Sequence, residues 1–397
     1  MKILHTSDWH LGQSFMGKSR LDEHRLFINW LSATVVEQGI EAVVLAGDVF
    51  DTSTPPSYAR ELYHDCVVQL NKLDCQFIVV AGNHDSVSVL NESKNLLAKL
   101  KAYVVTQPAW DNASEAVLEL KNQDGTLAAL VCAIPFLRAR DMVRYEMGQS
   151  GADKQLQLAE QIKRYYQQQF DYAKSISADV PIIGTGHLTM VGGEKTESVR
   201  DIYVGSLEAL SPSLLPEFDY LALGHIHKPM PVAGNSNWRY SGSPIPMSFD
   251  EANGPKSVCI YDTATRVAER LAIPVFRPLK SLKGERNELL KQIEQLDEPQ
   301  DLAIWLDITV NEDINLGPFQ EKLAQLCEGR NMEIVKVQRI RKAAGLFDGD
   351  GETATLEDIN PTEVFDRLLL EKEIEPSRAN ALKQLFTKIV NEQEQPS

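Results

Sequence analysis

The sequence predicts an α/β fold for roughly its first 270 residues, followed by a small α+β module and a helical hairpin. Two observations support the α/β class. Short apolar runs, rich in Val, Ile or Leu and bounded by Gly or Pro, indicate buried strands. Longer stretches with apolar residues at helical spacing separate the early runs, and strands that alternate with helices are typical of an α/β sheet core.

The first part of the chain contains six predicted strands, with helices between the early ones. The strands are "KILHTS" (2–7), "EAVVLAG" (41–47), "QFIVVAG" (76–82), "LAALVCAIP" (127–135), "VPIIGTG" (180–186) and "YLALG" (220–224). The predicted helices span residues 21–38, 57–73 and 88–101. In the first helix Leu26, Trp30 and Val35 recur at helical spacing, which predicts one apolar face.

The second part of the chain becomes richer in predicted strands and then changes composition after Ile273. "WRYSGSPIP", "KSVCIYD" and "RVAERLAIP" predict further strands of the first domain, which we place at 1–273. "AIWLDITVNED", a helix at 318–328 and "EIVKVQRIR" predict a strand–helix–strand module at 274–341.

The last part of the chain predicts a linker and a hairpin. Residues 342–358 are rich in Gly and Asp, which predicts a flexible linker before a helical hairpin at 359–397. Four of the hairpin's apolar residues share one helical face, namely Leu382, Leu385, Phe386 and Ile389. So short a hairpin cannot bury this stripe alone, and we expect it to dock on another surface.

The composition suits a globular protein and leaves the function open. Of the 397 residues, 43% are hydrophobic and 24% are charged. The formal net charge of −16 argues against a free-standing nucleic-acid binder, unless cations in the site or a basic partner attract the phosphates. Five scattered cysteines without CxxC spacing predict a reduced, cytoplasmic location. We expect neither a signal peptide nor a membrane span.

Five of the predicted strands lead into the same kind of residue. Asp, Asn or His follows each of them, as Asp8 and His10, Asp48, Asn83 and His84, His187, and finally His225 and His227. A Gly precedes several of these residues and allows the backbone to turn sharply. Because ligands of open α/β sheets bind at the carboxyl ends of the strands, we expect the side chains to converge on one site.

This set of residues predicts a site for two metal ions. Without His84 it offers seven ligands, which is too many for one tetrahedral ion with an open position. A lone histidine after a strand is usually only a satisfied polar group, but five strand ends of one kind favour the metal site. Asp48 is the natural candidate for a carboxylate that bridges the two ions. Carboxylate, imidazole and amide ligands without thiolate favour Mn, Fe or Zn over Ca or Mg. Two such ions about 3.5–4 Å apart are suited to phosphoryl hydrolysis.

The same residues carry a resemblance to a known family. "DWH", "GDVFD", "GNHD", "GH" at 186–187 and "GHIH" resemble the five motifs of the calcineurin-like metallophosphoesterases. "SPIPMSFDE" and the layout of the C-terminal part resemble the nuclease subunits of bacterial SbcCD complexes, and the likeness covers essentially the whole chain. The resemblance implies a metallophosphoesterase sandwich, with two mixed β-sheets flanked by helices. It also implies that the small module is a capping domain that binds DNA.

The resemblance implies specific roles for the strand-end residues. One ion would be held by Asp8, His10, Asp48 and His227, and the other by Asp48, Asn83, His187 and His225. In the family these ions are typically manganese. His84 matches the catalytic histidine, which protonates the leaving oxygen or stabilises the developing charge, as an imidazole near its pKa can do. Asp85 could orient the His84 ring or stabilise a turn, and Asp51 could support the site or cap a segment.

The resemblance also implies a substrate and partners. We expect a manganese-dependent exonuclease and endonuclease that processes double-strand DNA ends and hairpins in repair and recombination, close to the nucleoid. The hairpin would bind an SbcC-like ATPase, and helices 57–73 and 88–101 are candidates for a homodimer interface. Arg138 and Arg140 are candidates for contacts with DNA phosphates, although surface arginines are usually only solvated.

Two other functions stay open on the sequence alone. A phosphatase or nucleotidase of the same superfamily would use the same motifs, because they suit any phosphate ester. A non-catalytic scaffold on the same fold is disfavoured, because such a protein should have lost ligands, and here all seven and His84 are present. The chain has no GxxxxGK[ST] loop, so any ATP hydrolysis belongs to a partner.

Overall fold

Two mixed β-sheets of six strands each form the centre of the first part of the chain. The first sheet has the order β14 (Val267–Ala272), β13 (Ser257–Asp262), β1 (Lys2–Thr6), β4 (Ala42–Ala46), β5 (Gln76–Val80) and β6 (Ala102–Val105). The second has the order β11 (Met230–Val232), β12 (Asn235–Tyr240), β10 (Tyr220–Gly224), β9 (Ile182–His187), β8 (Leu127–Cys132) and β7 (Val117–Lys121). In the first sheet the parallel strands β1, β4, β5 and β6 have antiparallel pairs on one side only, at β13 and β14. In the second sheet the parallel strands β12, β10, β9 and β8 have an antiparallel strand at each edge, β11 and β7. The predicted pair of mixed sheets is confirmed.

The structure is a computed structural model that describes residues 1–143, 150–192, 196, 198–199, 209–297, 301–312, 314–339 and 382–383. The linker predicted at 342–358, and the hairpin predicted at 359–397 apart from residues 382–383, lie outside the described residues. The elements discussed below belong to one compact unit, which comprises Met1–Val310 and Asn315–Gln338. None of the helices in the described ranges combines the length and the apolar character that crossing a membrane requires.

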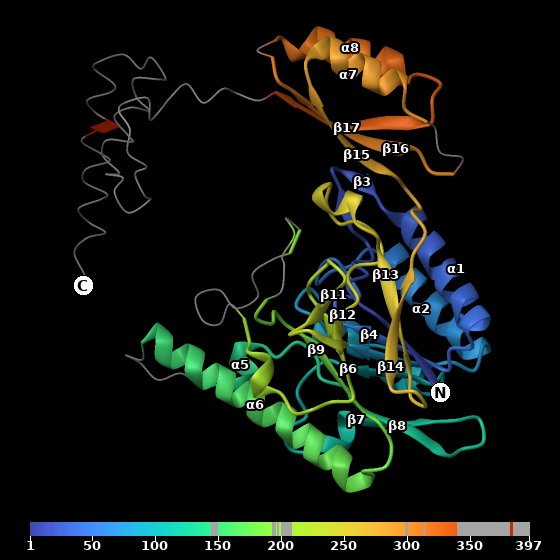
Figure 1. Cartoon of the computed structure of the whole chain (residues 1–397), viewed down its shortest axis with the longest axis vertical. Helices are drawn as coiled ribbons and strands as arrows, with labels where there is room; N and C mark the ends of the chain where they lie inside the picture. Colours follow the sequence, from blue (N-terminus) through green and yellow to red (C-terminus); the bar gives the residue numbers. More distant parts are fainter. Residues whose placement is uncertain are drawn as a thin grey trace. The chain divides into compact units, whose positions relative to one another are not determined.

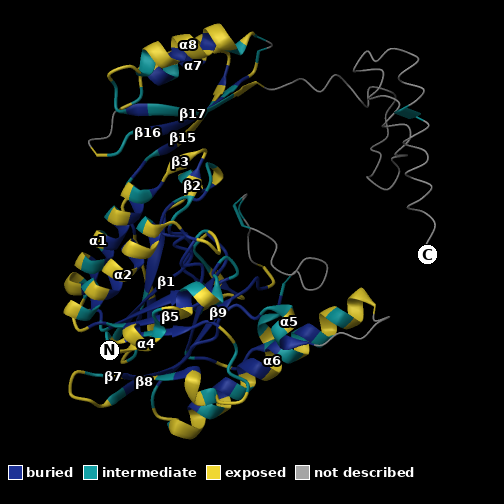
Figure 2. Cartoon of the chain, turned by 180° about the vertical axis from the view of Figure 1, so that it is seen from behind, coloured by how far each residue is buried: buried dark blue, intermediate teal, exposed yellow. Residues whose placement is uncertain are grey.

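The central strands are buried on both faces, which explains the consecutive apolar residues of β4 and β5. One apolar cluster fills the space between the sheets and includes Val44 of the first and Val131 of the second. The neighbouring residue Val43 points to the outer face of the first sheet and belongs to a different cluster. Because each fully buried Val or Leu side chain contributes roughly 1.5–3 kcal/mol, the two-sided burial of these strands is a large part of the fold's stability. Figure 2 shows β1, β5 and β9 as buried strands.

Helices cover the outer faces of both sheets. Helices α1 (Leu21–Gln38) and α2 (Ser57–Lys72) pack on the first sheet, and α6 (Gly151–Ile176) packs on the second. Figure 1 shows α1 and α2 on one side of the strands and α6 on the other. Two of these helices have the predicted bounds to within one residue, whereas the long helix α6 was not among the predicted elements. Its core face includes Leu158, Ile162 and Tyr165 at helical spacing.

The helix predicted at 88–101 is wrong as a single element. Residues of this stretch form α3 (Val87–Asn91) and α4 (Lys94–Ala98), which are separate short helices. The break falls where polar side chains make contacts outside the helix. Asn91 Oδ1 accepts a hydrogen bond from Thr106 Oγ1 at 3.1 Å, and Ser93 Oγ lies 3.2 Å from His64 Nε2. Such side chains compete with the helical backbone and favour caps and turns.

The remaining short elements lie between the main strands and helices. They are the hairpin β2 (Ser14–Phe15) and β3 (Lys18–Ser19), helix α5 (Ala139–Met142), and the 3-10 helices η1 (Ala113–Glu115), η2 (Pro212–Leu214) and η3 (Asp250–Asn253). The last of these begins inside the "SPIPMSFDE" stretch, and its residue Glu251 is buried.

The small module is a three-stranded sheet with two helices. Its sheet has the order β15 (Leu279–Gly284), β16 (Ile304–Val310) and β17 (Met332–Arg339), and the helices are α7 (Arg286–Glu294) and α8 (Leu316–Cys327). Both helices lie on one face of this sheet (Figure 1). The sequence predicted β16, α8 and β17 but not β15 and α7. Strand β15 contains only Leu279 and Leu282 as apolar residues, so its pattern is weak.

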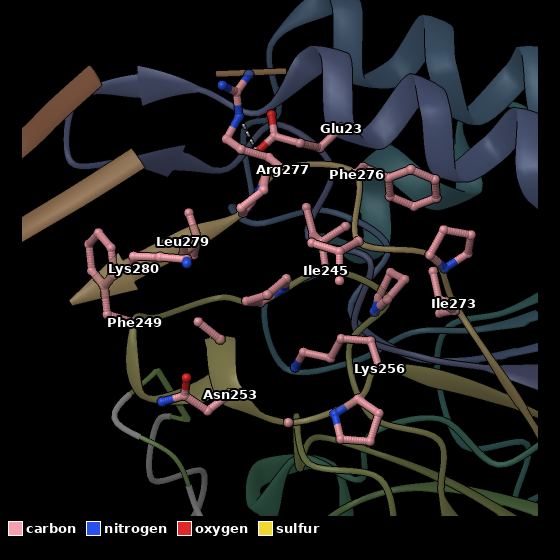
Figure 3. A pocket seen from close by; sticks show the side chains of 18 of the residues that line it. Glu23, Ile245, Phe249, Asn253, Lys256, Ile273, Phe276, Arg277, Leu279 and Lys280 are labelled. Atoms are coloured by element: carbon pink, nitrogen blue, oxygen red, sulfur yellow. Dashed lines mark ion pairs between the residues drawn. The ribbon is translucent and has the colours of Figure 1, made fainter. Parts of the chain in front are cut away.

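Buried charged and aromatic side chains join the small module to the sandwich. Glu23 of α1 accepts a hydrogen bond from Arg20 Nε at 2.7 Å, and Arg277 Nε lies 3.0 Å from the same carboxylate oxygen. The Arg277 guanidinium lies 4.2 Å from the ring centroid of Trp305, which stacks on Phe15. Figure 3 shows Glu23 and Arg277 at the wall of a cavity of about 500 Å³. We call Arg20, Glu23 and Arg277 the joint cluster.

Candidate metal centre

The predicted site residues come together where the two sheets meet. Strands β1, β4 and β5 lead into Asp8 and His10, Asp48, and Asn83 and His84. Strand β9 ends at His187, and β10 leads into His225 and His227. The sequence pattern predicted that these side chains converge at the edge of one open sheet. The structure instead places two of the five strands, β9 and β10, in the second sheet. His187 Nδ1 crosses between the sheets and donates to the carbonyl oxygen of Ala46 at 3.0 Å.

The backbone of this site is held in an unusual conformation. Four of the residues have a positive φ, namely Asp8 (55°), His10 (47°), Asp48 (52°) and His225 (95°). The left-handed region costs non-glycine residues roughly 1–2 kcal/mol each, and such strain concentrates at functional sites. Main-chain hydrogen bonds compensate part of it, because Asp8 N donates to Gly47 O and His10 N donates to Asp48 O, each at 3.0 Å.

Close approach of the loops requires glycine at two positions. A Cβ atom added to Gly82 would collide with the carboxylate and the amide nitrogen of Asp48. A Cβ atom added to Gly224 would collide with the carbonyl oxygen of Ala46. The glycines that precede the site residues therefore leave space for them, in addition to permitting a sharp turn.

The polar atoms of the site lie within coordination range of one another. Three groups of possible ligands occur in the described part of the chain: Asp8, His10 and His227; His10, Asp48 and His84; and Asp8, Asp48 and His187. Within each group the ligand atoms lie within 4.8 Å of one another. His10 Nε2 and His227 Nε2 are 3.2 Å apart, and His187 Nε2 is 3.2 Å from Asp48 Oδ2.

Asn83 and His225 lie beside these groups. Asn83 Oδ1 is 2.9 Å from His187 Nε2. The ring centroid of His225 is 5.4 Å from that of His187, and its amide nitrogen donates to Asp8 Oδ1 at 2.9 Å. The structure thus brings all seven predicted ligands and His84 together, although the ring nitrogens of His225 are not part of a three-residue group.

The outer nitrogens of three histidine rings are fixed by hydrogen bonds. His187 Nδ1 is bonded to Ala46 O, His84 Nδ1 lies 2.6 Å from Asp51 O, and His227 Nδ1 lies 3.2 Å from Glu251 Oε1. A bond at Nδ1 orients the ring and leaves Nε2 directed toward the centre. Metal-binding histidines show this arrangement almost always.

The electrostatics of the site suit cations. Burial lowers the pKa of His187, but the charge of Asp48 outweighs it and raises the pKa to about 9. Burial raises the pKa of Asp48, but the neighbouring His187 and His10 hold it well below its usual value. Among the described residues, Asp48 is ion-paired only with histidines, and Asp8 with no Lys or Arg. Buried carboxylates facing imidazole nitrogens are a donor set that divalent ions of the Mn, Fe or Zn type fit.

Asp85 and Asp51 have different roles from each other. The carboxylate of Asp85 accepts from the amide nitrogens of Gly82 (2.8 Å), Phe50 (3.0 Å) and Val49 (3.1 Å). Of the two predicted roles, the structure therefore supports the turn. Asp51 supports the site through its carbonyl oxygen at His84 and through its carboxylate, 3.2 Å from His10 Nδ1.

Arg138 and Arg140 lie near this edge but differ in environment. Arg138 Nη2 donates to the carbonyl oxygen of Asp85 at 2.9 Å, so the arginine braces the loop that presents His84. Arg140 is exposed and lies 3.6 Å from Asp141. Their contact with DNA stays a prediction.

The sequence did not identify Glu251 and Lys256 as parts of the site. Burial alone would raise the pKa of Glu251, but the hydrogen bond with His227 and the charge of Lys256 hold it well below its usual value. One sequence feature does mark Glu251, because the residue ends the "SPIPMSFDE" stretch that carries part of the resemblance.

Comparisons with known proteins show which family the chain belongs to. The sequence model of the family described as "Calcineurin-like phosphoesterase" matches residues 1–229, and that described as "Type 5 capsule protein repressor C-terminal domain" matches residues 275–373. SbcD of the nuclease SbcCD from Escherichia coli (strain K12) is 42% identical over 98% of this chain and 97% of its own length. The SbcD proteins of Rhodobacter capsulatus and Bacillus subtilis are 32% and 31% identical, over 71% and 78% of this chain and 71% and 79% of theirs.

The sandwich and the residues at its strand ends define a calcineurin-like phosphoesterase. Within that class, the chain belongs to the SbcD family of nucleases.

Proposed function

We propose that this chain is a nuclease subunit that hydrolyses phosphodiester bonds at DNA double-strand ends and hairpins, using two manganese ions. The observation that carries the proposal is the position of Asp48 between two groups of imidazoles. Its Oδ2 lies 3.2 Å from His187 Nε2 and 3.7 Å from His10 Nε2. A carboxylate in that position can bridge two ions, and a bridged pair suits phosphodiester hydrolysis.

The ligands divide into two sets that share Asp48. Asp8, His10, Asp48 and His227 would hold one ion, and Asp48, Asn83, His187 and His225 would hold the other. The proximity of His10 to His227 and of Asn83 to His187 supports this division. When bound, the two ions would neutralise charge on the phosphate and lower the pKa of water enough to supply the nucleophile.

His84 is suited to protonate the leaving oxygen. Its Nδ1 lies 2.6 Å from the carbonyl oxygen of Asp51, which can only accept, so Nδ1 carries a hydrogen. A second proton on Nε2 makes the ring a cation that can donate to an alkoxide leaving group. The ring centroid of His84 lies 4.8 Å from that of His10, so the acid would act directly beside the ions.

We further propose that the chain works in a complex. The net charge of −16 disfavours strong DNA binding by the chain alone, so site cations and a partner would supply the attraction to phosphates. An SbcC-like ATPase would bind the hairpin predicted at 359–397, and α2 with α3 and α4 would form a homodimer interface. Leu96 of α4 and Val68 of α2 are exposed apolar residues that fit an interface.

The experiment that tests the proposal is cleavage of linear double-stranded DNA and of a DNA hairpin with manganese, with magnesium or zinc as the alternatives. We expect the wild type to cleave with manganese, and Asp48→Asn and His84→Gln to lose at least about 100-fold in rate. His84→Gln should still bind two ions, whereas Asp48→Asn should not. The proposal fails if the wild type, with and without the ATPase, hydrolyses nucleoside monophosphates but not DNA.

A further inference from the structure

Glu251 lies at the centre of a buried polar network on the outer side of His227. The residue is 6% exposed, and its two carboxylate oxygens face different partners. Oε2 accepts from Lys256 Nζ at 2.5 Å and from the amide nitrogen of Met247 at 3.0 Å. Oε1 faces His227 Nδ1 at 3.2 Å and also contacts the Ser198 hydroxyl. Because both oxygens of this buried carboxylate have hydrogen-bond partners, its orientation is fixed.

The hydrogen bonds between His227 and Glu251 place a hydrogen on the outer ring nitrogen of the histidine. Lys256 can only donate, and the Glu251 carboxylate can only accept. Ser198 Oγ lies 2.6 Å from His227 Nδ1 and also contacts Glu251 Oε1. Because the carboxylate can only accept, a hydroxyl that satisfies both contacts donates to Glu251 and accepts from the histidine. Both routes from His227 to Glu251 therefore place a hydrogen on Nδ1. The neutral ring then presents the lone pair of Nε2 to the centre, 3.2 Å from His10 Nε2.

The same network also fixes the main chain of His227. Lys256 Nζ donates to the carbonyl oxygen of His227 at 3.0 Å while it is paired with Glu251. The histidine is thus held at its carbonyl group and at its outer ring nitrogen by one buried ion pair. This leaves the ring little freedom to turn its Nε2 away from the group formed with Asp8 and His10.

We propose that Glu251 is a positioning residue for His227, which it holds in the tautomer and orientation required to bind one of the two ions. The inference rests on the proposed function, because it takes His227 as a metal ligand. It assigns Glu251 to the ion held by Asp8, His10, Asp48 and His227, and not to the ion held by Asn83, His187 and His225.

The test is calorimetric titration of metal-free protein with manganese, for the wild type, Glu251→Gln and Asp250→Asn. We expect the Gln variant to bind one ion about 10- to 100-fold more weakly and the other as the wild type does. Asp250→Asn removes an exposed carboxylate from the adjacent position and should bind both ions normally. Nitrogen-15 spectra of the metal-free protein supply a second readout. His227 should carry its hydrogen on Nδ1 in the wild type and become a mixture of tautomers in Glu251→Gln.

The outcomes separate this inference from the proposed function. If the wild type does not bind two ions, the metal centre itself is wrong. If it binds two, and Glu251→Gln also binds both at wild-type affinity, only the role of Glu251 is overturned. Equal weakening of both ions would likewise overturn it, because that is the effect of a general structural defect. If Glu251→Gln does not fold, Ser198→Ala provides the test. We expect it to lower the affinity for the same ion, to a smaller extent. Unchanged binding of both ions would contradict the inference.

Discussion

Histidines in this chain acquire opposite properties from their surroundings. His5 and His187 are both fully buried, but burial lowers the pKa of His5 to about 3, whereas the adjacent Asp48 raises that of His187 to about 9. The main cause that raises the pKa of His187 is the carboxylate of Asp48, 3.2 Å from its Nε2. At the residue scale, the site is therefore distinguished by the pairing of imidazoles with buried carboxylates, and not by histidines as such.

The buried His5 predicts a specific dependence of stability on pH. Its folded-state pKa lies below the unfolded value of about 6.5, so its contribution to stability is complete above pH 6.5 and is lost as the pH falls. Between pH 8 and pH 5 the loss from this one group should be roughly 2 kcal/mol. We expect His5→Gln to show a correspondingly smaller decrease in the free energy of unfolding, measured by urea denaturation in the presence of a chelator. Parallel curves for the two proteins would contradict this account.

Among the contacts between elements, we expect the joint cluster to contribute most to the stability of the fold. Glu23 is fully buried between Arg20 and Arg277, so Glu23→Gln leaves two buried guanidinium groups without their counter-charge. We expect a loss of roughly 3 kcal/mol in the free energy of unfolding. Asp22→Asn is the matched control on the same helix, because Asp22 pairs with Arg25 at the surface and should contribute less than about 1 kcal/mol. Equal effects of the two substitutions, in thermal or urea unfolding, would show that the cluster does not stabilise the joint.

The strength of the apolar pattern explains which elements could be predicted from the sequence and which could not. Strands β1, β4, β5, β9 and β10 were predicted because they are buried on both faces and contain consecutive apolar residues. The site residues after these strands were predicted because Asp, Asn and His stand out directly after an apolar run. Helix α6 and strand β15 were missed, since the polar residues of one and the lysines of the other weaken the apolar pattern.

Tertiary contacts account for what the sequence could not predict. Residues alone indicated one open sheet, because local patterns do not say which strands pair; the sandwich came only from the resemblance. The role of Glu251 depends on Lys256 and His227, which approach it only in the folded chain. The single helix predicted at 88–101 failed because contacts of Asn91 and Ser93 with distant residues favour a break.

At the scale of the whole molecule, we expect metal binding and partner binding to be separable. Removal of residues 355–397 deletes the predicted hairpin and its apolar stripe but none of the proposed ligands. The truncated chain should bind two manganese ions as the full chain does and should no longer retain the ATPase in a pull-down. A full-length chain with Leu385→Glu and Phe386→Glu tests the apolar stripe itself. It should also bind two manganese ions and fail to retain the ATPase. Recovery of the complex with the truncated chain would contradict the proposed location of the interface.

We propose that Asp48 would hold both ions, at the edge where the two sheets meet. The most direct test is a crystal structure with manganese, using anomalous scattering at the manganese edge to locate the ions. We expect two anomalous peaks about 3.5–4 Å apart, both within coordination distance of the Asp48 carboxylate. One of them should also contact His10 and His227, and the other Asn83 and His187. A single peak, or two peaks that do not share Asp48, would contradict the account.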